Sequence, residues 1–227
     1  MPLIQNIMAD FRILSCLLLF ILASCSGSSP HKRRSGSTAS HPIATPVPSS
    51  GDFHHCLGDL NKEGVHYQLV PDRTFDNGCS IYHAVTMTSA QVPITHLGPL
   101  QCPAAENLAY WIDDAVLKSA KVWLGSPVIK VETFGSYSCR TRNSRAGAKI
   151  SEHGRANAVD ISAFDLADGR RITIKEGWRH GDRHTKDFLR SVFHAACRRF
   201  SVVISPDGDE YHQDHIHMDL GQSQYCH

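Results

Sequence analysis

Apolar residues recur at helical spacing in two stretches of the chain, residues 103–124 and 185–200. The first stretch begins with a proline and is followed by Gly125, as is typical of the two ends of a helix. Its apolar positions are Leu108, Trp111, Ile112, Ala115, Val116, Val122 and Trp123, and those of the second are Phe188, Leu189, Val192, Phe193, Ala196 and Phe200. The pattern predicts two helices that each bury one face, with both tryptophans of the first in the core.

Short stretches with β-branched residues or alternating polarity predict strands between and after these helices. They are Val128–Phe134, Ala158–Phe164, Arg171–Ile174, Val202–Ile204 and His215–Leu220. Asp168-Gly169 lies between the second and third stretches and favours a hairpin turn, so these two are expected to pair. The order of elements predicts an α+β domain whose antiparallel sheet is backed by helices.

The N-terminal region follows a different pattern from the rest of the chain. Arg12 precedes an apolar run, residues 13–22, that is too short for a membrane span and is typical of an export signal. The run ends in Leu-Ala-Ser-Cys, which resembles the lipobox of bacterial lipoproteins and implies a signal peptide over residues 1–24 and a lipid on Cys25. An ordinary signal peptide cut nearby is the alternative. Ser26 at the next position favours the outer membrane, with the protein facing the periplasm.

Composition divides the remainder of the chain into two parts. Residues 25–52 are rich in Ser, Pro, Thr and Gly and poor in large apolar residues, so we expect a disordered tether. Residues 53–227 are long enough for one domain with a substantial core. A formal net charge of +1 disfavours nucleic acid as a partner, and nothing in the pattern indicates an oligomeric state.

Eight cysteines are present, and setting aside Cys16 in the signal and Cys25 leaves six in the domain. They are Cys56, Cys79, Cys102, Cys139, Cys197 and Cys226. An even number in an exported chain predicts up to three disulfides, although six cysteines allow 15 connectivities. A cysteine-ligated zinc site is disfavoured because the chain contains no Cys-x-x-Cys pair.

Histidine and aspartate form a second pattern near the predicted hairpin and the last strand. His153 precedes Asp160 by seven residues, and on a strand the Asp160 carboxylate would face away from Val159 and Ile161. In the last strand, His215, His217 and Asp219 alternate with apolar residues and share one face. Two histidines and one carboxylate form the ligand set of a catalytic zinc site, where the ion activates water and polarises a carbonyl.

These segments resemble the zinc peptidases of bacterial cell walls: D-alanyl-D-alanine carboxypeptidases, penicillin-insensitive murein endopeptidases and the related hedgehog domain. The closer similarity is to the bacterial extensin-like C-terminal domain family, and it extends over about residues 56–217. It depends on three segments, Ser151-Glu152-His153 through Asp160, Ala196-Cys197-Arg198-Arg199-Phe200, and Asp214-His215-Ile216-His217-Met218-Asp219.

The resemblance implies a carboxypeptidase- or hedgehog-like fold and zinc bound by His153, Asp160 and His217. It also implies catalytic roles for four further residues. His215 would act as a base or transition-state stabiliser. His212 enters through the His-x-x-His-x-His spacing of the endopeptidases, and Asp214 occupies the position of a catalytic glutamate in carboxypeptidases. Arg140 corresponds to an arginine that holds the substrate or its developing oxyanion. One departure is Ala156, where the wider group usually has glycine.

The predicted function is therefore zinc-dependent hydrolysis of peptide or amide bonds in peptidoglycan stem peptides, at the cell envelope. The alternative is a catalytically silent wall-binding module that keeps a structural metal. A non-haem iron oxygenase has the same ligand types, but it usually places the carboxylate close to the first histidine. Asp219 is expected to orient a histidine rather than to bind the metal.

Overall fold

The computed structural model describes residues 49–227, so the predicted signal peptide, Cys25 and most of the predicted tether lie outside the described residues. The first element is helix α1 (Ser50–Lys62). It begins with a capping box, in which the Ser49 hydroxyl accepts the Asp52 backbone N–H and the Asp52 carboxylate accepts the Ser49 backbone N–H. Residues 50–52, predicted to belong to the tether, are therefore helical. Among residues 49–227, no helix is both long and apolar enough to span a membrane.

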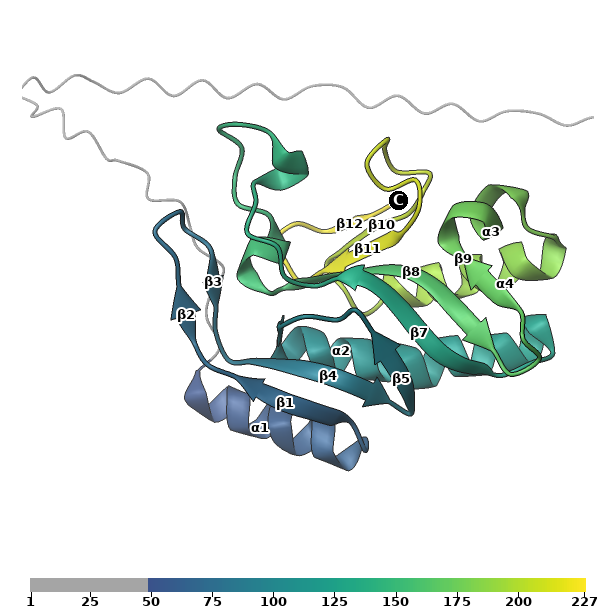
Figure 1. Cartoon of the computed structure of the whole chain (residues 1–227), viewed down its shortest axis with the longest axis horizontal. Helices are drawn as coiled ribbons and strands as arrows, with labels where there is room; N and C mark the ends of the chain where they lie inside the picture. Colours follow the sequence, from purple (N-terminus) through teal and green to yellow (C-terminus); the bar gives the residue numbers. More distant parts are fainter. Residues whose placement is uncertain (1–48) are drawn as a thin grey trace, which may run out of the picture. The chain divides into compact units, whose positions relative to one another are not determined.

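A ten-stranded sheet forms the centre of the domain (Figure 1). Its main path runs β1 (His66–Val70), β4 (Ala84–Ala90), β5 (Val92–Thr95), β7 (Val128–Gly135), β8 (Ala158–Leu166), β11 (Ile216–Asp219), β10 (Val202–Ile204) and β12 (Tyr225–Cys226). Strand β6 (Leu100–Gln101) pairs with β4, and β9 (Arg171–Thr173) pairs with β8. A separate two-stranded ribbon joins β2 (Arg73–Thr74) to β3 (Ser80–Ile81).

The sheet is mixed, so the prediction of a purely antiparallel sheet is wrong for two pairs of strands. β5 and β7 are parallel, and so are β10 and β12. A helical crossover separates β5 from β7, and a crossover of this kind is the connection that parallel neighbours require. The predicted hairpin is confirmed, because β8 and β9 pair antiparallel and Gly169 takes the left-handed conformation at the turn (φ +87°).

The predicted helix over residues 103–124 is continuous but irregularly wound. Helix α2 (Cys102–Trp111) leads into two π-helical segments, η1 (Ile112–Leu117) and η2 (Ala120–Leu124). Trp111 is fully buried and its indole N–H donates to the Val192 carbonyl (2.8 Å). Trp123, also predicted to be buried, is 36% exposed and donates to the Ser191 hydroxyl. Each π turn holds more residues than an α turn, so the apolar positions drift off the buried face.

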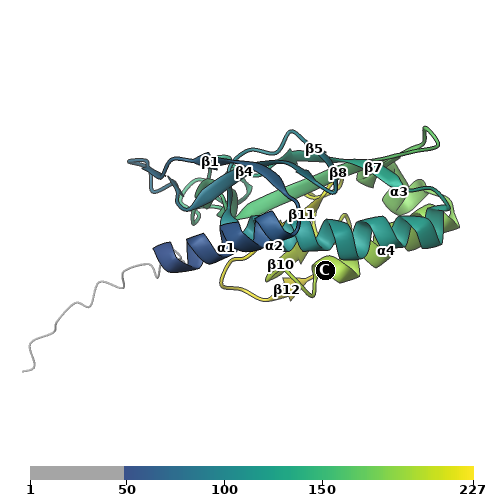
Figure 2. The same ribbon diagram turned by 90° about the horizontal axis from the view of Figure 1, so that it is seen from below.

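Helices α1, α2 and α4 (Arg183–Ala196) lie on one face of the sheet (Figure 2). Phe164 of β8 packs between Trp111 of α2 and Phe188 of α4, with ring centroids 6.3 and 5.1 Å apart. The helix predicted over 185–200 is α4, which is capped by Asp182 and ends at Ala196. Helix α3 (Ile174–His180), which the polarity pattern did not indicate, connects β9 to α4.

All six cysteines of the domain form disulfides: Cys56–Cys102, Cys79–Cys139 and Cys197–Cys226. The predicted number of bridges is thereby confirmed, and the structure supplies the pairing. The first bridge joins α1 to the start of α2, and the third joins the end of α4 to β12. The second joins the residue before β3 to the loop after β7, next to Arg140.

Candidate metal centre

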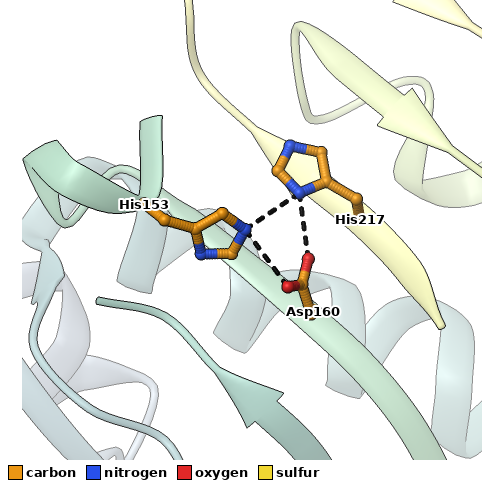
Figure 3. A group of neighbouring side chains, drawn as sticks. All are labelled: His153, Asp160 and His217. Atoms are coloured by element: carbon orange, nitrogen blue, oxygen red, sulfur yellow. Dashed lines mark hydrogen bonds and ion pairs between the residues drawn. The ribbon is translucent and has the colours of Figure 1, made fainter. Parts of the chain in front are cut away.

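Three elements bring His153, Asp160 and His217 together (Figure 3). His153 lies in a short 3-10 helix, η4 (Glu152–Arg155), which begins where the Ser151 hydroxyl accepts the His153 backbone N–H. Asp160 lies on β8, and His217 lies directly opposite it on the neighbouring strand β11. All three side chains are buried. Pairing in this register places the carboxylate and the second imidazole on the same face of the sheet.

The donor atoms of the three residues lie at the spacing that a tetrahedral metal requires. His153 Nε2 is 3.1 Å from His217 Nδ1 and 3.2 Å from Asp160 Oδ2, and His217 Nδ1 is 2.9 Å from Asp160 Oδ1. Ligands of a tetrahedral zinc ion with bonds near 2.0 Å lie about 3.3 Å apart. A zinc ion fits among these atoms with little movement of the side chains.

The outer nitrogen of each imidazole is held by an acceptor. His153 Nδ1 donates to the Ser136 carbonyl (3.0 Å), and His217 Nε2 donates to the Asp219 carboxylate (2.8 Å). These bonds set the tautomer of each ring, so the neutral imidazoles turn their lone pairs inward, toward each other and toward Asp160. Such an arrangement needs a positive charge at its centre, from either a proton or a metal ion. The predicted orienting role of Asp219 agrees with this geometry.

Without a metal ion, the charges and hydrogen bonds of the centre favour a proton on His217. Burial alone would lower the pKa of His217, but hydrogen bonds to Asp160 and Asp219 outweigh it and raise the pKa to about 9. Burial would likewise raise the pKa of Asp160, yet the hydrogen bonds and charges of His153 and His217 hold it well below its usual range. The centre is therefore built to keep one positive charge beside the Asp160 carboxylate.

A cavity of about 380 Å³ opens beside the three ligands and is lined by His153, His217 and three other groups of residues. Arg140, Arg142 and Asn143 line one part, His212 and Asp209 line another, and the remainder comes from Ser151, Glu152, Val202, Ile204, Asp219, Ser223, Gln224 and Tyr225. Basic, acidic and apolar groups together suit a polar peptide better than a purely apolar ligand.

Two histidines flank the centre, each paired with a carboxylate. His212 lines the cavity, its Nδ1 is 2.6 Å from Asp209 Oδ1, and burial lowers its pKa despite that carboxylate. His215 Nδ1 is 2.9 Å from Asp214 Oδ1, and its Nε2 is 3.6 Å from Asp160 Oδ1. Asp214, at the position of a catalytic glutamate in carboxypeptidases, contacts His215 and also lines a separate groove.

Sequence reasoning missed two acidic residues of this cavity, Asp209 and Glu152. Asp209 is in a turn where nothing marks it apart from the neighbouring Asp207, and Glu152 adjoins His153. The buried Glu152 accepts a hydrogen bond from the Asn157 amide (2.8 Å). The departure at Ala156 now has a structural meaning, because this residue ends η4 in the left-handed conformation (φ +55°) that glycine adopts more readily.

Comparison with known families identifies the chain. The model of a family described as "Extensin-like protein C-terminus" matches residues 54–227. The chain belongs to this family. No curated protein and no solved structure matches it. Membership of the extensin-like family does not by itself define an activity, which depends on the residues of the site.

Proposed function

We propose that this extensin-like domain is a zinc-dependent hydrolase of peptide or amide bonds in peptidoglycan, held at the bacterial cell envelope by a lipid on Cys25. The observation that carries the chemistry is the inward convergence of His153 Nε2, Asp160 and His217 Nδ1 beside an open cavity. The choice of peptidoglycan rests on the resemblance to wall peptidases. The envelope location, with the domain facing the periplasm from the outer membrane, rests on the lipobox-like N-terminal segment.

The donor set suits zinc, which commonly takes two histidines and one carboxylate and leaves a fourth position open for catalysis. His153, Asp160 and His217 would hold the ion. When bound there, zinc would lower the pKa of a water molecule and polarise the substrate carbonyl. Asp219 and the Ser136 carbonyl would keep the two imidazoles in their ligand orientation.

Hydrolysis of an amide requires one group to accept a proton and another to donate one to the departing nitrogen. We assign these tasks to His212 and His215, which flank the centre and each hold a carboxylate on Nδ1. That bond occupies Nδ1 of each ring and leaves proton exchange to Nε2, which in His215 lies 3.6 Å from Asp160 Oδ1. The lowered pKa of His212 keeps this residue neutral near pH 7, as a base must be.

Arg140 lines the cavity together with the two ligand histidines. We assign it to the substrate carboxylate or to the oxyanion that develops during attack, because a guanidinium group offers several donors in a fixed plane. The loop that carries Arg140 is fixed close to the centre, since its carbonyl accepts the Ser151 backbone N–H (3.0 Å).

The proposal is tested by metal analysis of the purified domain and by mass spectrometry of muropeptides before and after incubation. We expect one zinc per chain, and cleavage that stops on chelation and returns with zinc. His153→Ala and His217→Ala should abolish cleavage, while His184→Ala, at an exposed position of α4, should leave it unchanged. A domain that contains no metal, or full cleavage by both ligand variants, would refute the proposal.

The rival function is a silent wall-binding module in which the same metal has only a structural role. It would bind muropeptides with the affinity of a specific ligand, retain one zinc per chain and release no product. Turnover by the wild-type protein that is lost in His212→Ala, with zinc content unchanged, would exclude this module.

A further inference from the structure

A second concave site, separate from the cavity, lies next to the metal centre. This groove, of about 320 Å³, is lined by Glu132, Phe134, Ser162, Ala163, Arg171, Thr173, Lys175, Glu176 and Asp214. It lies over β7, β8 and β9 and the start of α3, and it shares no lining residue with the cavity beside His212. None of the proposed metal ligands and none of the proposed proton-transfer histidines lines this groove.

The groove adjoins the metal centre through two of its residues. Asp214 both lines the groove and binds His215 Nδ1 (2.9 Å), and the exposed Phe134 ring packs edge-on against His215, with centroids 5.8 Å apart. Ser162 follows Asp160 by two residues on β8, and such residues share a face about 7 Å apart. A ligand chain that crosses the centre therefore reaches the groove within about two extended residues.

The charged groups of the groove differ in how they are already used. The Arg171 guanidinium is neutralised by Glu132 (2.6 Å) and Asp165 (2.8 Å). Within residues 49–227, the Lys175 ammonium and the Glu176 carboxylate form no ion pair, and both residues are exposed. Ala163, Thr173 and Phe134 supply apolar surface. The groove thus offers a cation and an anion, each without a partner, beside an apolar surface that an aliphatic side chain can cover.

We propose that this groove is a substrate subsite for a residue with an aliphatic side chain that ends in both an ammonium group and a carboxylate. Lys175 pairs with the carboxylate, Glu176 and Asp214 face the ammonium group, and Phe134 packs against the aliphatic chain. Resting on the proposed function, this inference adds that the substrate extends on both sides of the scissile bond. One side occupies the cavity and the other occupies the groove, as in an endopeptidase rather than an enzyme that removes a single terminal residue.

The test measures binding alone, in chelated protein, so it does not depend on zinc or on turnover. Three synthetic tetrapeptides are compared by NMR titration of the labelled protein to millimolar concentration, differing only in whether the third residue is diaminopimelate, lysine or norleucine. We expect the diaminopimelate peptide to bind tightest and to shift the resonances of Phe134, Thr173 and Lys175. Lys175→Glu should weaken binding of the diaminopimelate peptide about threefold to fivefold and should leave binding of the norleucine peptide unchanged.

Two further variants complete the design. Glu176→Lys should weaken the diaminopimelate and lysine peptides to a similar extent, because both carry the ammonium group. Lys121→Glu, an exposed charge reversal in η2 outside the groove, should leave all three affinities unchanged. Equal affinity of the three peptides, no binding by any of them, or resonance shifts confined to the cavity would overturn the subsite. None of these results would alter the evidence on metal content and cleavage.

Discussion

At the scale of single residues, the candidate centre depends on groups that never touch the metal position. The Asp219 carboxylate binds His217 Nε2 with one oxygen and the Gly221 backbone N–H (2.7 Å) with the other. It is thus held in place, and it fixes the ring that presents Nδ1 to the centre. Asp209 likewise holds His212, which lines the cavity, but through Nδ1 of the ring. Because His217 is a candidate metal ligand and His212 is not, we expect Asp219 to support metal binding and Asp209 to support proton transfer.

Asp219→Asn should weaken zinc binding about 10-fold to 100-fold, because it removes the charged acceptor that orients His217. Asp209→Asn should leave zinc affinity within about twofold of the wild type and lower the rate of cleavage instead. Competition with a chromophoric chelator measures the first quantity, and product formation from muropeptides measures the second. Equal losses of zinc affinity in both variants would contradict this division of roles.

Zinc affinity should rise with pH, because a ligand histidine has to lose its proton before it binds the ion. His217 has a pKa of about 9 in the metal-free protein, so the apparent affinity should increase about tenfold per pH unit from 7 toward 9 and then level off. The same raised pKa stabilises the metal-free fold fully below the ordinary value of 6.5. That contribution should be lost as the pH rises through 9. Titrations with zinc and thermal unfolding at several pH values measure the two effects.

At the scale of elements, the apolar pattern predicted those helices and strands in which apolar residues recur at a regular spacing. The hairpin β8–β9, helix α4 and strand β11 follow their sequence patterns closely. The π-helical segments after Trp111 do not, since a change in residues per turn rotates Val122 and Trp123 out of the core without any marker in the sequence. Elements β1 to β6 were not predicted, because all but the seven-residue β4 span five residues or fewer and their burial depends on pairing with other strands.

The disulfide Cys79–Cys139 should matter more to the metal centre than the other two bridges do. Gly154, next to His153, leaves room for the Cys79 sulfur, since a Cβ atom there would lie only 3.1 Å from it. Ser138, beside Cys139, donates its backbone N–H to the His153 carbonyl (3.2 Å). The bridge therefore holds η4 from two sides.

Replacing Cys79 and Cys139 by serine should lower zinc affinity at least about tenfold, as loss of a support around a ligand does. Replacing Cys197 and Cys226 by serine serves as the matched control and should mainly lower thermal stability, by about 2–4 kcal/mol. Zinc titration and thermal unfolding of both double variants separate the two effects. Similar zinc affinities in the two double variants would contradict the special role of the Cys79–Cys139 bridge.

At the scale of the whole molecule, the site lies where distant segments of the chain meet. Helices α1, α2 and α4 lie on one face of the sheet (Figure 2), and the three candidate ligands come from η4, β8 and β11. The ligand types and their order were predictable, because His153, Asp160 and His217 are adjacent to recognisable strands. The flanking carboxylate Asp209 and the groove were not, since both arise from loops and strands that only the fold brings together.

Removal of the metal should lower the stability of the entire domain, because the ion binds the folded centre and not the dispersed ligands of the unfolded chain. At a free zinc concentration about 100 times the dissociation constant, the expected loss on chelation is about 2.7 kcal/mol. Thermal unfolding with and without chelator measures it, and the His217→Ala variant should show no such difference. A chelator effect of equal size in that variant would place the bound metal elsewhere.

The pairing of His217 with Asp160 across β11 and β8 also determines when the candidate metal centre forms during folding. The two residues are 57 positions apart, so the centre is assembled by sheet formation rather than by a local loop. A chain still being synthesised has only His153 and Asp160 until β11 emerges, and a shift of one residue in register would turn His217 to the wrong face. If the domain is the hydrolase proposed above, a chain in which β8 and β11 have not paired would have no activity, so cleavage would begin only once folding is complete.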